Sequence, residues 1–315
     1  MMEPTSDSST LDIYGSQSTL RPSGLGAELT YDLTLAMTIG FGVVFVFVML
    51  LLWVAWRRQT PAGHWWVWSG GILLPVAAIV VLMTASTAIL VASTRSDDEA
   101  LVIDVTGYQF WWDVVYDPDG IALRDANELV LPAGRPVTLR LKSDDVIHSF
   151  WVPSISGKMD MIPGRINTLT VRPEEPGRYR GQCAEFCGLS HPRMAFEVVV
   201  LELDAFDEWL LTTQGEARDA AQPELLAGKQ VFIDAGCSAC HEIRGVAEGG
   251  RLGPDLTRVG ARASLGAGMW RMNQGNLAGW IADVGDMKPG AQMPSYNHLS
   301  GPELRAVSAY LASLR

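Results

Sequence analysis

The chain has 315 residues, a length that accommodates two or three domains, and a formal net charge of −11 at pH 7. Because an acidic chain repels a phosphate backbone, this charge argues against a nucleic-acid partner and favours a basic protein partner. There are four cysteines, and all of them fall in the two short motifs described below, so the sequence predicts no disulfide framework.

Residues 1–30 are polar and rich in Ser, Thr and Gly, with no cationic stretch ahead of an apolar core. We expect a disordered or loosely docked tail here, and neither a cleaved signal peptide nor a lipoprotein anchor.

Two strongly apolar runs follow, at residues 33–56 and 72–91. Each is long enough to cross a bilayer as a helix, and Pro75 in the second run is tolerated in membrane helices. The alternative is a buried helix of a soluble protein, which two runs of this length and purity disfavour. Residues 31–95 are therefore predicted to form a transmembrane hairpin.

The loop between the two runs indicates the orientation of the hairpin. Arg57 and Arg58 place this loop on the cytoplasmic side, because positive charge favours that side. The loop also carries a tryptophan cluster at residues 65–68, which suits the headgroup layer. Both termini are therefore expected on the outer face.

After residue 95 the pattern changes to short strands separated by Pro and Gly. Val137, Leu139 and Leu141 alternate with polar residues, which is typical of a half-buried strand. Residues 166–171 and 195–201 also have strand composition. This pattern predicts a β-sandwich or barrel over residues 96–203.

The stretch CAEFCGLSHPRM places two thiols, an imidazole and a thioether close together, at Cys183, Cys187, His191 and Met194. Soft sulfur beside imidazole is typical of copper sites, and a weak thioether completes many copper electron-transfer sites. His148, in DDVIHSFWVP, is the other histidine placed to join this set. The alternatives are a disulfide or a tetrahedral zinc site, but neither accounts for Met194.

This constellation resembles the dinuclear copper A centre of cytochrome c oxidase subunit II. The resemblance implies a cupredoxin fold in which two thiolates bridge two copper ions and each copper carries one histidine. It also implies that the Glu185 carboxylate helps to bind a Mg²⁺ shared with subunit I. The implied copper ligands are His148, Cys183, the carbonyl of Glu185, Cys187, His191 and Met194.

The stretch GYQFWWDVVY at residues 107–116 resembles the aromatic cluster between the donor-docking face and copper A in that family. Phe110, Trp111 and Trp112 are then the expected electron-entry aromatics. The family usually has a tryptophan where this chain has Phe110, and phenylalanine lacks the indole N–H. The alternative is an ordinary aromatic strand packed into the sandwich.

Residues 204–222 are acidic and rich in alanine, and they are predicted to form a helix followed by a linker. As a flexible coil of roughly twenty residues, the linker keeps the next domain within about 25 Å of its anchor. At such a high effective concentration, a weak docking face is sufficient.

The stretch CSACH contains the C-x-x-C-H signature of covalent haem attachment at Cys237, Cys240 and His241. A lone C-x-x-C also occurs in redox and zinc sites, but the added histidine disfavours both. Residues 253–256 and 301–314 resemble the proximal turn and C-terminal helix of class I cytochromes c. The segment MKPGAQMPSY resembles the loop in which the axial methionine precedes a proline, which implies Met293 as the second axial ligand. The alternative axial ligands are Met287 and His298, with Met269 and Met272 less favoured by position.

Taken together, these motifs resemble subunit II of a caa3-type haem–copper cytochrome c oxidase with a fused cytochrome c domain. The implied architecture is a two-helix transmembrane hairpin, an all-β cupredoxin sandwich and an all-α class I cytochrome c domain. The corresponding boundaries are 1–30 for the tail, 31–95 for the hairpin, 96–203 for the copper domain, 204–222 for the linker and 223–315 for the cytochrome domain.

The implied function is the transfer of electrons from a donor through haem c and copper A to subunit I, where O₂ is reduced and protons are pumped. The implied partners are subunits I and III, membrane lipid, and either a cytochrome c or a quinol–cytochrome complex as donor, at a bacterial plasma membrane. The rivals are a copper A-containing nitric oxide reductase and a copper delivery or storage protein. A quinol oxidase is disfavoured because its subunit II lacks the cysteines.

Overall fold

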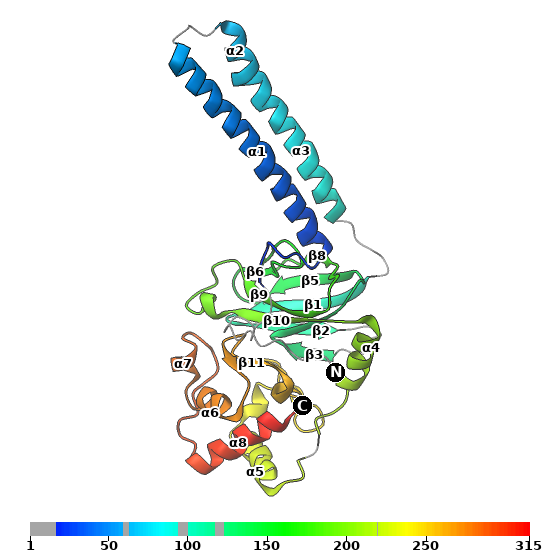
Figure 1. Ribbon diagram of the computed structural model, residues 1–315. Coiled ribbons are helices and arrows are strands. Elements are labelled where there is room, and N and C mark those ends of the chain that lie inside the picture. Colours follow the sequence, from blue (N-terminus) through cyan, green and yellow to red (C-terminus); the bar gives the residue numbers. More distant parts are fainter. Residues whose placement is uncertain (1–16, 59–62, 94–99, 117–122, 219) are drawn as a thin grey trace, which may run out of the picture.

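The computed structural model describes residues 17–58, 63–93, 100–116, 123–218 and 220–315. A helical hairpin stands at one end, a β-sandwich lies in the middle, and a small helical domain packs against the far side of the sandwich (Figure 1). The predicted fold class is therefore confirmed.

The hairpin consists of two long apolar arms. One arm is α1 (Leu25–Arg58), and the other is built from α2 (His64–Trp68), a π-helical turn η2 (Ser69–Leu73) and α3 (Leu74–Ser93). Both arms have the length and hydropathy of a membrane span, and their most apolar windows are 0% buried. A core helix of a soluble protein would be mostly buried, so this exposure favours lipid or partner helices as their surroundings.

The segment before α1 returns to the sandwich and is ordered against it. The Ser23 amide donates to the Ser154 carbonyl (2.7 Å), and the Glu174 amide donates to the Ser23 carbonyl (2.8 Å). The helix α1 begins at Leu25, within the segment predicted as a tail. Residues 1–16 of that predicted tail lie outside the described residues.

Two five-stranded sheets form the sandwich, in the orders β3-β2-β1-β5-β8 and β4-β10-β9-β6-β7. The first sheet contains β1 (Leu101–Tyr108), β2 (Trp111–Tyr116), β3 (Leu123–Ala126), β5 (Val137–Ser143) and β8 (Asn167–Val171). The second contains β4 (Glu128–Pro132), β6 (His148–Trp151), β7 (Met159–Met161), β9 (Gly177–Cys183) and β10 (Ala195–Leu201).

The core between the sheets follows the alternation seen in the sequence. Val137, Leu139 and Leu141 are fully buried, and burial of each such side chain contributes about 1.5–3 kcal/mol. Between the sheets, the Trp112 ring lies 4.9 Å from Phe196, and Phe196 lies 4.8 Å from Phe150, measured between centroids. The same Trp112 ring also lies 6.2 Å from the ring of His148.

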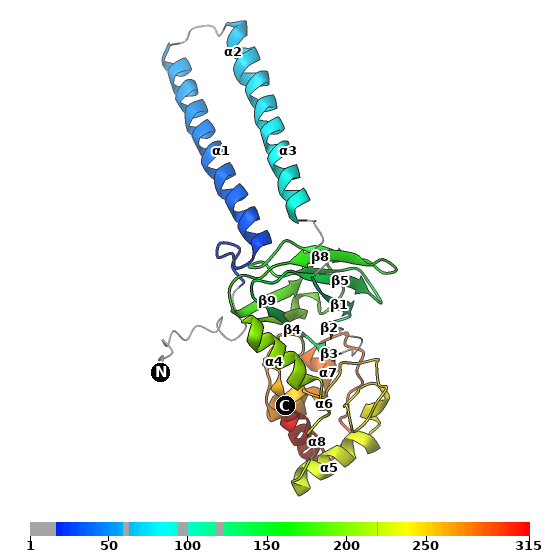
Figure 2. The same cartoon turned by 90° about the vertical axis from the view of Figure 1, so that its right-hand side faces the viewer.

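The C-terminal domain is helical and lies below the sandwich in Figures 1 and 2. Its last helix starts with a capping box in which the Ser300 hydroxyl accepts from the Glu303 amide while Glu303 accepts from the Ser300 amide. The elements from the sandwich onward are α4 (Leu203–Thr213), α5 (Pro223–Asp234), η4 (Cys237–Ala239), η5 (Val259–Ala261), β11 (Ser264–Leu265), β12 (Trp270–Arg271), α6 (Gln274–Ala282), α7 (Val284–Met287) and α8 (Gly301–Ser313).

The connection after α4 is not free of the helical domain. Arg244 donates to the carbonyls of Thr213 (3.0 Å) and Gly215 (3.2 Å), and the Ala217 amide donates to the Arg244 carbonyl (2.9 Å). The start of the predicted flexible linker is therefore held against the domain that it was expected only to tether.

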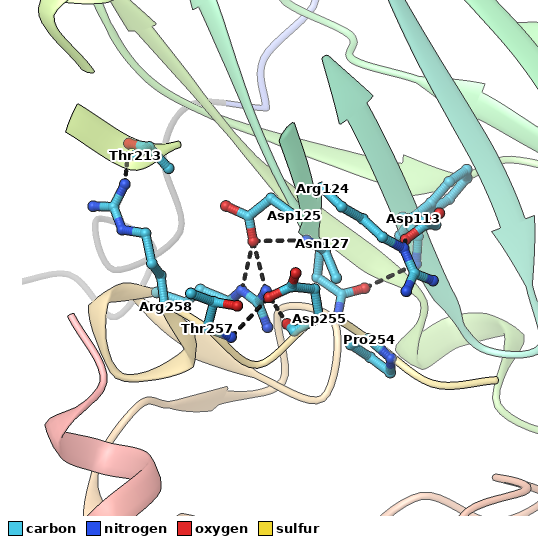
Figure 3. A network of polar contacts seen from close by, with 12 residues as sticks. Asp113, Arg124, Asp125, Asn127, Thr213, Pro254, Asp255, Thr257 and Arg258 are labelled. Atoms are coloured by element: carbon cyan, nitrogen blue, oxygen red, sulfur yellow. Dashed lines mark hydrogen bonds and ion pairs between the residues drawn. The ribbon is translucent and has the colours of Figure 1, made fainter. Parts of the chain in front are cut away.

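A buried ion pair joins the two domains at the edge of the first sheet. Arg262 of the helical domain donates to Asp125 on β3 at 2.6 Å and 2.9 Å, and also to the Asp255 carbonyl at 2.6 Å. Arg124, beside Asp125, donates to the Arg251 carbonyl (3.4 Å). Figure 3 shows Asp113, Arg124 and Asp125 of the sandwich beside Asp255 and Thr257 of the helical domain.

Candidate metal and haem sites

The cysteine loop is held at both ends by the second sheet. The Cys183 amide donates to the Met194 carbonyl (2.8 Å), and the Ala184 amide donates to the Ser149 carbonyl (2.9 Å). Because β6 pairs with β9 through Phe150 and Cys183, the sheet register brings His148 beside the loop. Two residues far apart in sequence thus meet through strand pairing.

The expected copper ligands converge into two matched halves. The Cys183 sulfur lies 3.8 Å from Nδ1 of His148 and 3.2 Å from the Glu185 carbonyl oxygen. The two sulfurs are 3.9 Å apart, which is far beyond the length of a disulfide bond.

The second half of the donor set surrounds the other sulfur. The Cys187 sulfur lies 3.6 Å from Nδ1 of His191 and 3.7 Å from the Met194 thioether. Met194 is buried while His191 is half-buried. Each thiol therefore has one imidazole and one weaker donor of its own.

The ring of His148 is oriented by a carboxylate. Its Nε2 lies 2.7 Å from Asp145 Oδ1. A carboxylate accepts, so Nε2 carries the proton and Nδ1 presents its lone pair to the thiols. Burial lowers the pKa of His148, but Cys183 and Asp145 outweigh burial and raise the pKa above its usual value.

The two thiols are strongly coupled. The hydrogen bond from Cys187 lowers the pKa of Cys183 to about 4, and the same bond together with burial raises the pKa of Cys187. One thiolate is thus already favoured in the protein alone, which suits a site whose ligands must be deprotonated.

The side chain of Glu185 points away from the thiols toward the surface. Its carboxylate forms a long ion pair with Lys158 (3.9 Å), and Lys158 also contacts Asp160 (3.2 Å). A Mg²⁺ at Glu185 would therefore need further oxygen ligands from a partner chain.

The expected entry aromatics are mostly buried. Phe110 is 4% and Trp112 is 1% exposed, while Trp111 is half-buried and stacked on Tyr108 at 4.7 Å. Trp112 lies 6.2 Å from the His148 ring. The cluster thus adjoins His148, an expected copper ligand, but Phe110 is not a surface group.

In the helical domain, the C-x-x-C-H motif lies at η4 after α5. Cys237 and Cys240 are half-buried free thiols. Nδ1 of His241 lies 2.8 Å from the Pro254 carbonyl, which only accepts, so Nε2 is left free as a ligand. Burial lowers the pKa of His241 and favours the neutral ring.

The proximal turn leaves no space beside His241 for a larger residue. A Cβ at Gly253 would lie 2.5 Å from Cε1 of His241, so glycine is needed for the ring to take this position. The turn predicted from residues 253–256 therefore supports the histidine directly.

The expected distal residues line one side of the helical core. Met293 and Tyr296 pack half-buried against the same cluster as Cys237. Met287 ends α7 and lies over Gly279, while His298 is exposed. Half-buried apolar side chains beside two thiols and an imidazole fit a haem, which would cover them.

Sequence reasoning missed the residues that support these ligands. Asp145 accepts from His148 and from the Gln109 amide (2.6 Å), and the Gln109 side chain donates to the Cys187 carbonyl (2.5 Å). Asp145 could have been found from the sequence, because it is an acidic residue shortly before His148. Gln109 comes from another strand turn and had no local signal.

Two family models match the chain. "Cytochrome C oxidase subunit II, periplasmic domain" matches residues 115–202, and "Cytochrome c" matches residues 225–315. The two matches fall on the sandwich and on the helical domain.

Two curated relatives match nearly the whole chain. "Cytochrome c oxidase subunit 2" of Alkalihalophilus pseudofirmus is 33% identical, covering 94% of this chain and 90% of that protein. The protein of the same name from Bacillus subtilis is 30% identical, covering 95% and 92%. Among solved structures, the periplasmic domain of subunit II of cytochrome oxidase of Bradyrhizobium japonicum is 30% identical, covers 38% of this chain and 96% of that one, and has a TM-score of 0.36.

Proposed function

Because this chain belongs to the cytochrome c oxidase subunit II family, in the form fused to a C-terminal cytochrome c domain, we propose that it holds a dinuclear copper A centre and one covalent haem c. The chain is a subunit of an oxidoreductase whose O₂ site lies in a partner subunit. Nothing in the comparisons favours a nitric oxide reductase.

The observation that carries the copper proposal is the pairing of donors. Each thiol has its own imidazole and its own weak donor, as two metal ions with two bridging thiolates require. A single tetrahedral zinc would use four ligands and leave two of these donors without a role. The proposed ligands are His148, Cys183, the carbonyl of Glu185, Cys187, His191 and Met194.

In the helical domain we propose thioether bonds from Cys237 and Cys240 to the haem, with His241 and Met293 as axial ligands. The free Nε2 of His241 and the position of Met293 over the same core support this assignment. Copper A and haem c each supply a one-electron carrier. The residues of the chain hold them, exclude water and set their separation.

Membership of the family implies association with other oxidase subunits and a membrane anchor with periplasmic domains. We further propose subunit I as the electron acceptor, with subunit III in the same complex and a Mg²⁺ shared at Glu185. We propose as donor a cytochrome c or a quinol–cytochrome complex. We also propose that both termini lie outside a bacterial plasma membrane, and the packing of the segment before α1 on the sandwich supports this orientation.

The test uses matched cysteine substitutions in the purified oxidase complex. Cys187→Ser is expected to abolish the mixed-valence copper spectrum and lower the copper content, because each thiolate is needed by both metal ions. Cys240→Ser is the control, and it is expected to weaken haem attachment while leaving the copper spectrum intact. Normal copper content and spectrum in Cys187→Ser, or a wild-type chain carrying one zinc and no copper, would contradict the proposal.

A further inference from the structure

Two loops of the cytochrome domain contact the copper domain. The first is the turn between β11 and β12, where the Ala267 carbonyl accepts from the Ala195 amide (3.1 Å) and the Gly268 carbonyl accepts from Arg180 (3.2 Å). The second is the segment Met287–Gly290, which leads into the loop of Met293. The interface is thus larger than the weak docking face expected for a tethered domain.

The segment Met287–Gly290 is bound by the copper loop itself. The Ser190 hydroxyl donates to the Pro289 carbonyl (2.7 Å), and Arg193 donates to the Met287 carbonyl (3.0 Å). These two donors flank His191, a proposed copper ligand. These two hydrogen bonds therefore join the backbone beside one proposed copper ligand to the backbone that leads to the proposed axial methionine.

Lys288 lies between Met287 and Pro289, and its side chain makes a different set of contacts from theirs. Its ammonium donates to the Phe110 carbonyl (2.7 Å) of the copper domain and to the Gly266 carbonyl (2.7 Å) of the other docking loop. It is 2% exposed, and burial lowers its pKa to about 7. Burial of a lysine is rare unless it is satisfied by fixed partners, and here those partners belong to both domains.

Phe110 is closed off by the same segment. A Cβ on Gly290 would lie 3.2 Å from Cε2 of Phe110, and one on Gly188 of the copper loop would lie 3.2 Å from its Cζ. The ring therefore sits between the cytochrome segment and the copper loop. An external donor cannot contact Phe110 while the domain is docked, whereas the cytochrome domain already does.

We propose that Met287–Gly290 is the contact through which electrons pass from the cytochrome domain to the copper loop, and that Lys288 is the positioning residue that holds this contact in place. The inference rests on the proposed function. In the step, one electron is lost at the haem and gained at the copper pair, with no bond formed or broken. Lys288 acts through the Phe110 and Gly266 carbonyls and touches neither redox group.

The experiment uses the intact oxidase complex with Lys288→Met, which keeps the length of the side chain and removes both hydrogen bonds. Haem c is reduced by a light flash, and the rate at which the copper absorption changes is recorded. We expect a rate about 10- to 100-fold lower, because small displacements of reacting partners reduce rates on this order. Hydrogen exchange of residues 287–291 and 266–269 is measured on the same samples and is expected to be faster.

Two controls and a second variant complete the design. Lys229→Met on α5 replaces the other lysine of the cytochrome domain, and Ser313→Ala removes a hydroxyl that bonds within its own helix; neither is expected to change the rate or the exchange. Ser190→Ala removes the bond to Pro289 and is expected to slow transfer less than Lys288→Met does. If Lys288→Met does not assemble, Ser190→Ala decides by the same two measurements.

Intact copper and haem spectra with an unchanged transfer rate would overturn the inference while leaving the proposed function standing. Slower transfer with unchanged hydrogen exchange would also overturn it, because Lys288 would then not hold the segment. Absence of either cofactor spectrum from the wild-type complex would instead refute the proposed function.

Discussion

The copper domain and the cytochrome domain differ in how much of their core the chain itself supplies. Among the described residues, the sandwich has one cluster of 27 buried hydrophobic residues, whereas the cytochrome domain has a cluster of 10, surrounded by half-buried apolar side chains. The two domains are of similar length. The sandwich can therefore build its metal site before the metal binds, but the cytochrome domain needs an apolar cofactor to complete its core.

The hydrogen bonds around the two sites support this contrast. In the sandwich, each of the six proposed copper donors already lies within 3.9 Å of another member of the set. In the cytochrome domain, His241, the proposed proximal ligand, is oriented by a direct bond to the Pro254 carbonyl, while Met293 packs half-buried against the helical core. A site made of buried strands is thus preformed, and a site made of loops around a cofactor is completed by that cofactor.

The largest expected effect tests this contrast by removing each cofactor in turn. Cys237→Ser combined with Cys240→Ser is expected to abolish covalent haem and to unfold the cytochrome domain, because its remaining core is small. Cys187→Ser is expected to abolish the copper spectrum and leave the sandwich folded. Limited proteolysis followed by mass spectrometry would report which domain is cleaved. Equal resistance of both domains in the haem-free variant would remove the contrast.

The next effect concerns the distal side of the haem. Met293→Ala is expected to remove the methionine-to-iron band at the red end of the ferric spectrum, because alanine offers no sulfur, while the haem stays attached. Met287→Ala is the matched control, since Met287 instead packs over Gly279, and the band is expected to persist. The reverse pattern would move the axial ligand to Met287.

The features of the fold and of the candidate sites that could be predicted are those whose sequence pattern spans only a few residues. The sequence motif around Cys183–Met194 contains five of the six proposed donors, and strand alternation at Val137–Leu141 predicted β5, because both signals lie within a few residues. The C-terminal helix was predicted over residues 301–314 and ends at Ser313. These features follow from short-range periodicity and from ligand spacing.

The domain interface was not predictable in the same way. From the sequence alone, Lys288 cannot be told from a surface lysine, and Asp125 cannot be told from the other acidic residues of the chain. Each is buried where the two domains meet, through contacts that span more than a hundred positions. Since burial at a domain interface has no local pattern, the sequence predicted a tether with a weak docking face, whereas the structure shows contacts at several points of the interface.

A third prediction tests whether the buried ion pair holds the domains together. Asp125→Ala leaves Arg262 buried beside a lost partner, and an uncompensated buried charge of this kind costs about 3–5 kcal/mol. Denaturant unfolding of the cytochrome domain, followed by its haem absorption, would measure the loss.

The control for this loss lies on the same sheet. Asp104→Ala breaks the exposed pair with Arg140, whose side chain is 50% exposed, and exposed pairs contribute about 0–1 kcal/mol. If Asp125→Ala costs no more than Asp104→Ala, the ion pair is incidental to docking. In that event, Arg262→Met, which replaces the charge by an apolar side chain, should also leave the free energy of unfolding nearly unchanged.

The smallest effect concerns Glu128, a half-buried residue on β4 that lines a small cavity with Asp125 and Arg262. Burial, and then the neighbouring Asp125 and Glu197, raise its pKa from 4.5 to about 7.

A carboxyl group whose pKa is higher in the folded chain stabilises the fold below the unfolded pKa, and this stability is lost as the pH rises from about 4.5 through about 7. Glu128→Gln removes that loss, so the variant is expected to be more stable than the wild type by about 3 kcal/mol at pH 8 and to match it at pH 4.5. Thermal unfolding of the sandwich at both pH values would measure the difference, with Glu208→Gln on the exposed face of α4 expected to stay within about 0.5 kcal/mol of wild type. A Glu128→Gln protein that is less stable at pH 8 would mean that the carboxylate is paired with a cation such as Arg262. Glu128 would then help to hold the cytochrome domain at this edge of the copper domain.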